Sequence, residues 1–364
     1  MKSVPFHGAC AAALLTAALP ALSAEGFQVR YNVAGSLGGE MFAPPDQTGW
    51  GVGAAATYIN VDKVTGGDGH RLKVAVPGGT VALGASPTPY DPSYGAKEIE
   101  VDAGGGFRIY NLALGYITTA QYGGGRLAML LNLQYGAKSQ SFNARTTAPA
   151  LNWPSGSIPN PATKGAVTQQ FESSYLTRIQ AMASGETGED TGMGDTELQA
   201  GWLYANERWR VLAGASVVLP TGSYDSAAGP DVGTGNFYTF RPAVQVAWMP
   251  QSNVAVAGKL TLGFNTRNSD NDLRSGNWLG LEGAVAYKTP LGPIGLHAIH
   301  IQQTQDDSGN PYGDARLRLT NAGVFFTTKL PVADAVVTLQ TMKSTDSRYA
   351  KQGSFHQIRV IKVF

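Results

Sequence analysis

The stretch "RLAMLLNLQY", residues 126–135, decides the fold class of this chain because its side chains alternate in character. The odd-numbered positions are apolar and end in an aromatic ring: Leu127, Met129, Leu131, Leu133 and Tyr135. The even-numbered positions are mostly small or polar: Arg126, Ala128, Leu130, Asn132 and Gln134. A period of two is the signature of a β-strand with two unlike faces.

The same alternation recurs along the chain and predicts about 12 strands of roughly 10–13 residues, long enough to cross a bilayer when tilted. Tyr and Trp stand at or near the ends of several apolar faces, where a membrane barrel has its interfacial girdle. The expected strands begin near Trp50, Phe107, Gly125, Gly194, Glu207, Phe237, Ser252, Asn277, Pro293, Ala315, Ala333 and Ser354.

The connections between these strands alternate between short and long. Those after the even-numbered strands are short, as in "ANE" at 205–207, whereas the others are long and rich in Gly, Pro, Asp and Asn. A bacterial barrel requires this alternation and a soluble sandwich does not. We therefore expect an all-β fold, a transmembrane antiparallel up-and-down β-barrel with short periplasmic turns and long extracellular loops. A hairpin at 71–84, inside the first long loop, would raise the strand count to about 14.

The two ends of the chain suggest its domain plan. Residues 1–24 are typical of a signal peptide, with Lys2, an apolar run too short to span a bilayer, and small residues up to Ala24. Residues 25–49 are expected to be a periplasmic segment or a plug in the lumen, and residues 50–364 the barrel in a Gram-negative type of outer membrane. Loss of the leader would remove Cys10, the only cysteine, and with it any disulfide or thiol chemistry.

Charge and the last strand indicate the partners. The chain has 27 Lys and Arg against 26 Asp and Glu, and without Lys2 it is neutral (27 − 1 = 26), which argues against nucleic acid. A closed barrel pairs its last strand with its first, so Phe364 can end the final strand and act as an assembly signal. The expected partners are outer-membrane lipid, a small apolar solute, and the barrel-assembly machinery through the C-terminal strand.

Four motifs in order carry a family resemblance: "GMGDTELQAGW" at 192–202, "VVLPTGSYD" at 217–225, "NTRNSDNDLRSGNW" at 265–278 and "IQQTQDDSG" at 301–309. On these motifs the chain resembles the meta-pathway phenol-degradation family of exported outer-membrane barrels, from about Gly192 to the C-terminus. The resemblance implies a link to the degradation of aromatic or other apolar compounds and a role in their uptake. It implies no catalytic residues.

Charged residues predicted to face the lumen are the main site candidates, either as a polar pathway or as Arg–Glu braces. They are Arg126, Glu197, Arg210, Arg241, Lys259, Glu282, Arg316 and Arg318. A second set of carboxylates could bind a divalent cation, although a solvated outer loop is the plainer interpretation. These are Glu186, Glu189, Asp190 and Asp195.

The sequence offers little for catalysis. His297 and His300 are three residues apart on a strand, so they point to opposite faces and cannot share a metal or a substrate. No phosphate loop, dinucleotide motif or other cofactor motif is present. We therefore expect an outer-membrane barrel for passive uptake of small apolar or aromatic compounds, and not an enzyme. The alternatives are a structural or partner-binding barrel without transport and, last, a barrel enzyme.

Overall fold

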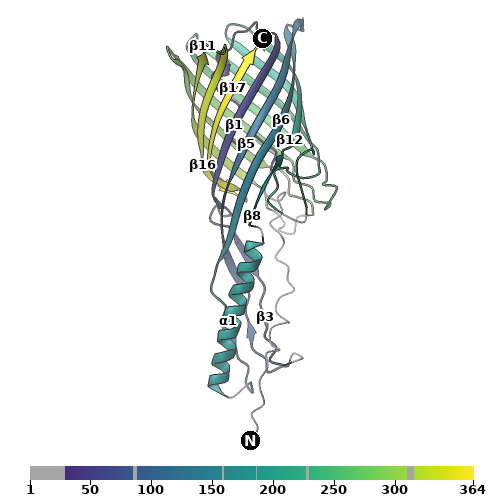
Figure 1. Ribbon diagram of the computed structural model, residues 1–364, viewed down its shortest axis with the longest axis vertical. Helices are drawn as coiled ribbons and strands as arrows, with labels where there is room; N and C mark the ends of the chain where they lie inside the picture. The colour runs from purple at the N-terminus through teal and green to yellow at the C-terminus, as the bar shows by residue number, and fades with distance from the viewer. Residues whose placement is uncertain (1–28, 85–87, 158–159, 186, 227–228, 310–314) are drawn as a thin grey trace. The chain divides into compact units, whose positions relative to one another are not determined.

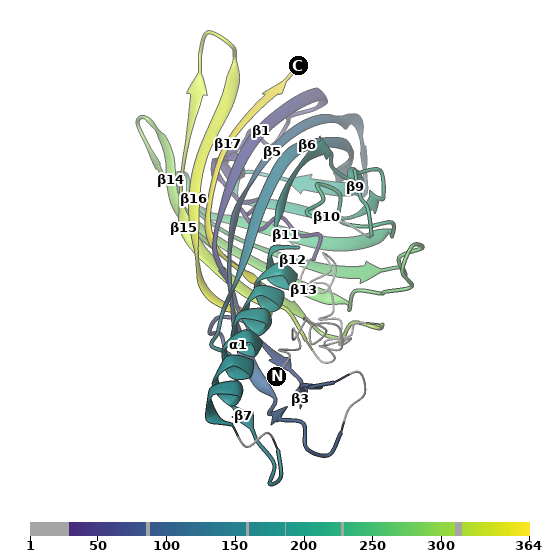
Figure 2. The same ribbon diagram turned by 60° about the horizontal axis from the view of Figure 1, so that its bottom comes forward.

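The computed structural model describes residues 29–84, 88–157, 160–185, 187–226, 229–309 and 315–364. Its main feature is an antiparallel sheet in which twelve strands close into a barrel (Figure 1, Figure 2). The barrel strands are β1 (Gly49–Val64), β5 (Lys97–Tyr122), β6 (Gly125–Arg145), β9 (Thr196–Ala205), β10 (Trp209–Leu219), β11 (Thr239–Gln251), β12 (Val254–Asn265), β13 (Trp278–Thr289), β14 (Gly292–Gln303), β15 (Arg318–Leu330), β16 (Ala335–Arg348) and β17 (Lys351–Val363).

The barrel closes between its first and last strands. Gly51 of β1 stands opposite Val363 of β17, and on its other side β1 pairs with β5. The ring continues from β5 through β6 to β9 and then in chain order to β17. No barrel strand is left with an open edge, as the hydrocarbon of a membrane demands. The predicted barrel and its count of twelve strands are confirmed.

The hairpin expected at 71–84 does not add two strands to the barrel. Its first half, β2 (Lys73–Val76), pairs with the beginning of β5. Its second half, β3 (Gly79–Thr80), pairs with β4 (Ser93–Tyr94), which in turn pairs with β7 (Leu151–Asn152). The upper limit of 14 barrel strands was therefore wrong, because the two halves find separate partners.

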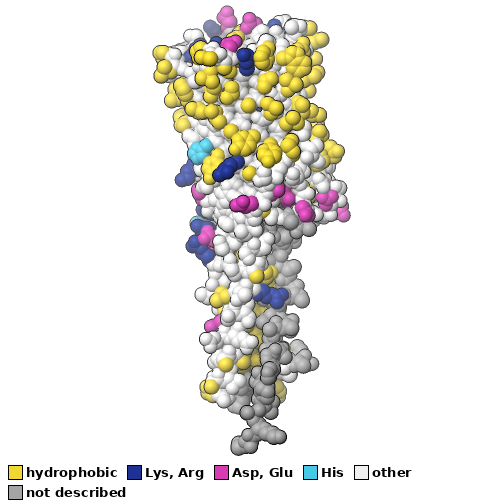
Figure 3. All heavy atoms as spheres, in the orientation of Figure 1, with side chains coloured by type: hydrophobic (Ala, Val, Ile, Leu, Met, Phe, Trp, Pro, Cys, Tyr) yellow, Lys and Arg dark blue, Asp and Glu magenta, His cyan; other side chains and the backbone are white. Residues whose placement is uncertain are grey.

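Outward apolar side chains are exposed on strands throughout the barrel, and Figure 3 shows the belt that they form on one face. Leu112 and Leu114 of β5 are 55% and 44% exposed, and Met129 of β6 is 57% exposed. Exposing so many apolar side chains to water is unfavourable in free energy, whereas exposing them to lipid is favourable. Faces and belt together are those of an outer-membrane barrel. The short turns from β5 to β6, β9 to β10, β11 to β12, β13 to β14 and β15 to β16 lie at the same end as the C-terminal Phe364. The connection from β16 to β17, at the other end, is also short and not long as expected, because both strands extend almost to the turn.

A second compact unit is formed by residues 71–102 and 142–185, within the described ranges. Its helix α1 (Pro161–Ser184) begins where the side chain of Asn160 accepts a hydrogen bond from the Ala162 N–H at 2.9 Å. Three residues four apart, Phe171, Tyr175 and Ile179, are buried in an apolar cluster with Val76, Val81, Tyr94 and Ile99. Burial raises the pKa of the Tyr94 and Tyr175 phenols. Among the described residues no helix is long and apolar enough to span a membrane.

Candidate functional site

Residues 29–48 form an irregular segment against the inward face of the barrel, with one 3-10 turn, η2 (Gly39–Phe42). Buried backbone groups need partners, and here the barrel wall supplies many of them. The wall residues that hydrogen-bond or ion-pair with the segment are Arg210, Thr239, Arg241, Lys259, Glu282, Asn321, Thr327, Thr338, Gln340 and Arg359. These residues come from β10–β13 and β15–β17.

Arg30 fixes the beginning of the segment. Its guanidinium forms an ion pair with Asp195 at 2.9 Å and donates to the Gly235 carbonyl at 2.8 Å. The same group lies 3.9 Å from the centre of the Phe237 ring, a cation–π contact. Both charged side chains are almost fully buried, at 3% and 6% exposure, so their pairing offsets part of the cost of burying two charges.

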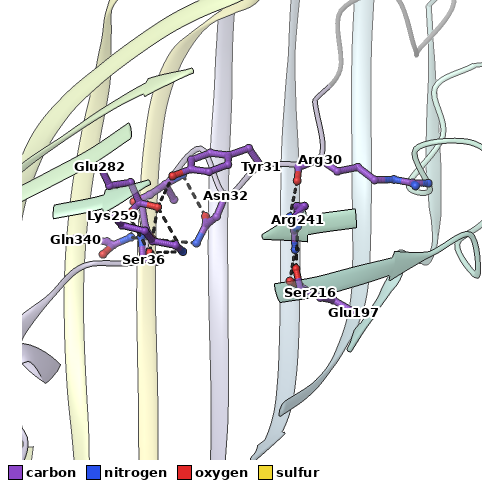
Figure 4. Close-up of polar contacts among 12 residues, drawn as sticks. Arg30, Tyr31, Asn32, Ser36, Glu197, Ser216, Arg241, Lys259, Glu282 and Gln340 are labelled. Atoms are coloured by element: carbon purple, nitrogen blue, oxygen red, sulfur yellow. Dashed lines mark hydrogen bonds and ion pairs between the residues drawn. The ribbon is translucent and has the colours of Figure 1, made fainter. Parts of the chain in front are cut away.

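Glu282 of β13 is the centre of the polar contacts in the middle of the segment (Figure 4). Its carboxylate accepts hydrogen bonds from the Tyr31 hydroxyl at 2.6 Å and from the Ser36 N–H at 2.8 Å. Lys259, its register partner on β12, lies 3.7 Å away and donates to the Ser36 hydroxyl at 2.9 Å. One buried wall carboxylate thus satisfies two groups of the segment and a neighbouring cation.

Arg241 of β11 links the segment to the adjacent wall (Figure 4). It forms an ion pair with Glu197 of β9 and donates to the Ser216 hydroxyl of β10 at 3.1 Å. It also donates to the backbone carbonyl of Arg30. The guanidinium therefore braces three strands and the segment together, which is the use to which its several fixed donors are suited.

The end of the segment is held near the short turns. Glu40 pairs with Arg359 of β17 at 2.8 Å, and the Ala43 carbonyl accepts from Arg210 at 2.9 Å. Gly39 packs so closely on the wall that an added Cβ would lie 2.3 Å from Cβ of Thr327. A glycine at this position allows the backbone to approach the strand, and the Gly39 N–H donates to the Thr327 hydroxyl at 3.0 Å.

Five of the predicted lumen charges make these contacts: Glu197, Arg210, Arg241, Lys259 and Glu282. Arg126 lies on the inward face of β6, beside its register partner Leu203 on β9. The Nε of Arg126 has no hydrogen-bond partner among the described residues. The segment's own Tyr31, Ser36 and Glu40 did not stand out in the sequence.

Arg316 and Arg318 do not face the lumen, which corrects the prediction for the start of β15. Leu317 and Leu319 occupy the inward positions and are buried in an apolar cluster with Trp278 and Ile301. The alternate positions therefore point away from the lumen. Arg316 pairs with Asp306 at 2.6 Å and Arg318 with Asp346 at 2.8 Å. The hydrogen bond from Arg316 lowers the pKa of Asp306.

The proposed cation-binding carboxylates do not gather into one site, so this prediction was wrong for the residues described. Glu189 and Asp190 are neighbours on β8 (Gly188–Met193) and point to opposite faces. Asp190 accepts from the Val232 N–H at 2.9 Å, whereas Asp195 is paired with Arg30. Glu186 lies outside the described residues. In the described ranges, no group of three or more His, Cys, Asp or Glu side chains could hold a metal ion.

The two sides of the inward face differ in exposure. On β12–β16 the inward side chains are almost all buried, as at Ala257, Glu282 and Ile299. On β5, β6, β9 and β10 the inward side chains are partly exposed: Ile109, Asn111, Ala113, Ile117, Ala128, Leu130, Gln199, Leu203 and Leu212. The segment therefore covers one side of the lumen, and accessible space remains beside the other.

Comparison with known proteins gives the fold relatives. The crystal structure of an outer membrane channel from Pseudomonas putida F1 aligns with a TM-score of 0.58 at 14% identity, covering 93% of this chain and 100% of that one. A FadL homologue from Pseudomonas aeruginosa aligns at 0.36 and 11% identity, covering 92% and 98%. The CymD monoaromatic hydrocarbon channel aligns at 0.33 and 13% identity, covering 92% and 95%. The first alignment supports the shared barrel fold. The TM-scores of the other two are too low to support a conclusion.

The sequence comparison is more specific. No curated protein sequence matches the chain. A family model described as "Putative MetA-pathway of phenol degradation" matches residues 91–360, which is most of the barrel and includes all four motifs singled out above. The chain therefore belongs to this phenol-degradation family of outer-membrane barrels.

Proposed function

We propose that this protein is an outer-membrane channel through which small apolar or aromatic molecules diffuse passively into the cell. The observation that carries the proposal is the unequal burial of the two sides of the lumen. A barrel filled only for stability would bury its inward side chains all round, as small barrels do. Here the inward face of β5, β6, β9 and β10 keeps accessible side chains. The family's link to phenol degradation is consistent with such a role.

The chemistry of the accessible side suggests the class of solute. Its side chains are mainly aliphatic or small, such as Ile109, Ala113 and Leu130, with a few neutral amides, such as Gln199. Most of the lumen charges are paired with each other or with the segment on the opposite side. An apolar surface with a few polar groups suits a small aromatic molecule better than an ion or a sugar.

We propose residues 29–48 as a fixed plug that narrows this path. The ion pairs and hydrogen bonds at Arg30, Glu282 and Arg359 support that role, because they hold the segment at three levels. We also propose that residues 1–24 are removed as a signal peptide and that the last strand, up to Phe364, is read by the assembly machinery. N-terminal sequencing of the mature protein tests the first of these two points.

The test of transport places a large side chain in the path. Ala113→Trp adds an indole to the inward face of β5, whereas Leu114→Trp adds one to the lipid face of the same strand. The initial rate of radiolabelled naphthalene uptake is measured in cells that carry either variant or the unchanged protein. We expect Ala113→Trp to reduce uptake to near the level of cells without the protein, because the path is narrow.

Leu114→Trp should leave uptake unchanged, since Trp is well placed on a lipid-facing surface. Both variants are first checked for folding by their migration on gels before and after boiling. Equal uptake by all three proteins would contradict the transport proposal, and equal loss in both variants would show that the effect is not specific to the lumen.

A further inference from the structure

A row of exposed polar side chains crosses four neighbouring strands on the outer wall of the barrel. Arg108 of β5 stands opposite Tyr58 of β1, and Tyr58 stands opposite His356 of β17. His356 in turn stands opposite Thr341 of β16. Lys343 is two residues farther along β16, in the direction of the long loops. All five side chains are exposed, so together they form one surface, which we call the β16–β5 row.

This row lies at the outer edge of the apolar belt. From Tyr58, the exposed positions of β1 lead to Trp50, which pairs in register with Tyr116 at the short-turn end. Trp50 to Tyr58 is nine residues, about the length that a tilted strand needs to cross the hydrocarbon. Figure 3 shows basic and His side chains gathered at this edge of the yellow belt, over the front strands of Figure 1. The row is therefore at the height of the lipid headgroups on the long-loop side.

The two cations of the row have no ion-pair partner among the described residues. Arg318, also on the outer side of the barrel, differs in this respect because it is paired with Asp346 of β16. No such partner is found for Arg108 or Lys343 in the described ranges, although both are exposed. Two unpaired cations at headgroup height attract anionic groups, and an arginine binds phosphate with two parallel hydrogen bonds.

The groups between the two cations are ordered. The rings of Tyr58 and His356 stack with their centres 6.4 Å apart. Nδ1 of His356 is hydrogen-bonded to the Thr341 hydroxyl at 2.9 Å, which leaves Nε2 for a further partner. The row thus offers a cation at each end and a fixed imidazole and phenol between them.

We propose that the β16–β5 row binds the phosphorylated sugar headgroup of an outer-leaflet glycolipid. Arg108 and Lys343 are three strand spacings apart across the sheet and two residues apart along it, roughly 16 Å in all, a separation that suits a sugar headgroup with two phosphates better than a single small anion. The apolar belt directly below the row would contact the acyl chains. The proposal depends on the orientation with the long loops outside and is independent of which solute the lumen carries.

The test measures glycolipid binding to the detergent-purified protein by native mass spectrometry. The probes are bisphosphorylated lipid A and lipid A from which both phosphates have been removed, and inorganic phosphate is added as a competitor. The variant Arg108→Ala/Lys343→Ala removes both cations of the row. The matched control Arg208→Ala/Lys329→Ala removes two exposed cations at the short-turn end, so that the net charge is the same.

We expect the row variant to bind bisphosphorylated lipid A about tenfold more weakly, because each cation at a membrane surface contributes measurably to anionic lipid binding. The control variant should bind it as the unchanged protein does, and the dephosphorylated lipid should bind weakly to all three. Unchanged affinity in the row variant, or an equal loss in the control, would overturn the proposal. So would equal binding of the dephosphorylated lipid, or displacement by millimolar phosphate, which would mark a site for free phosphate.

Discussion

At the scale of single residues, Glu282 joins the irregular segment to the barrel wall. It accepts from the Tyr31 hydroxyl and the Ser36 N–H and lies beside Lys259. Its own side chain is almost fully buried, at 2% exposure. These donors and the nearby cation offset the cost of burying the carboxylate. Removing the charge of Glu282 would leave Lys259 without a counter-ion.

Glu282→Gln should therefore destabilise the protein and loosen the segment. We expect a loss of about 2–3 kcal/mol in the free energy of unfolding, measured by denaturant titration in lipid vesicles. Glu207→Gln, on the exposed turn between β9 and β10, is the matched control and should change stability by less than about 0.5 kcal/mol. A similar small change in both variants would mean that Glu282 does not hold the segment.

The sequence identified most lumen charges but not their partners. Alternation along a strand places Glu197, Arg241, Lys259 and Glu282 on the face opposite the apolar residues, and this part of the reasoning is local. The same reasoning wrongly predicted that Arg318 faces the lumen, because the inward positions there are occupied by Leu317 and Leu319. The partners in residues 29–48 could not be predicted, because an irregular segment has no period and its contacts come from distant strands. Arg359, between Ile358 and Val360, carried the same signal as the residues found and was missed.

At the scale of elements, the compact unit that contains α1 was missed because its signal is weak. The residues of α1 that it buries, Phe171, Tyr175 and Ile179, make a single narrow stripe in an otherwise polar segment. The early start of β5, at Lys97 rather than near Phe107, was missed for a related reason. Its first residues alternate charge with apolar side chains, and they pair with β2, so they lack the pattern of a lipid-facing strand.

The packing of α1 gives a test at this scale. Phe171→Ala removes a buried ring that contacts Tyr94 and Tyr175, and we expect it to destabilise this unit by about 3 kcal/mol. Hydrogen exchange of residues 161–184 should become much faster, while exchange in the barrel strands stays slow. Leu176→Ala, at a 39% exposed position of the same helix, should change exchange little. Equal effects of the two substitutions would argue against the apolar cluster.

At the scale of the whole barrel, local patterns were sufficient to predict the architecture. Strand length, the apolar outer face and the alternation of short and long connections all reflect the bilayer, which acts on every strand in the same way. The division of the lumen into a covered and an accessible side could not be predicted in this way. This division depends on which strands residues 29–48 contact, and the sequence of a single strand does not indicate those contacts.

The measurement that tests this division most directly is labelling of single cysteines in the folded protein. The chain's only cysteine is Cys10, so a Cys10→Ser background has no thiol of its own. Ala113→Cys places a thiol on the accessible side, on β5, and Ala257→Cys places one on the covered side, on β12. The rate of reaction with N-phenylmaleimide, a small aromatic reagent, is measured for each, with the urea-unfolded proteins as the reference.

Reaction of a thiol depends on access as well as on its pKa. We expect the thiol at position 113 to react on the order of ten times faster than the thiol at position 257 in the folded protein, and at the same rate after unfolding. Equal rates in the folded protein, or faster reaction at 257, would contradict a path for small aromatic molecules along the β5 side of the lumen.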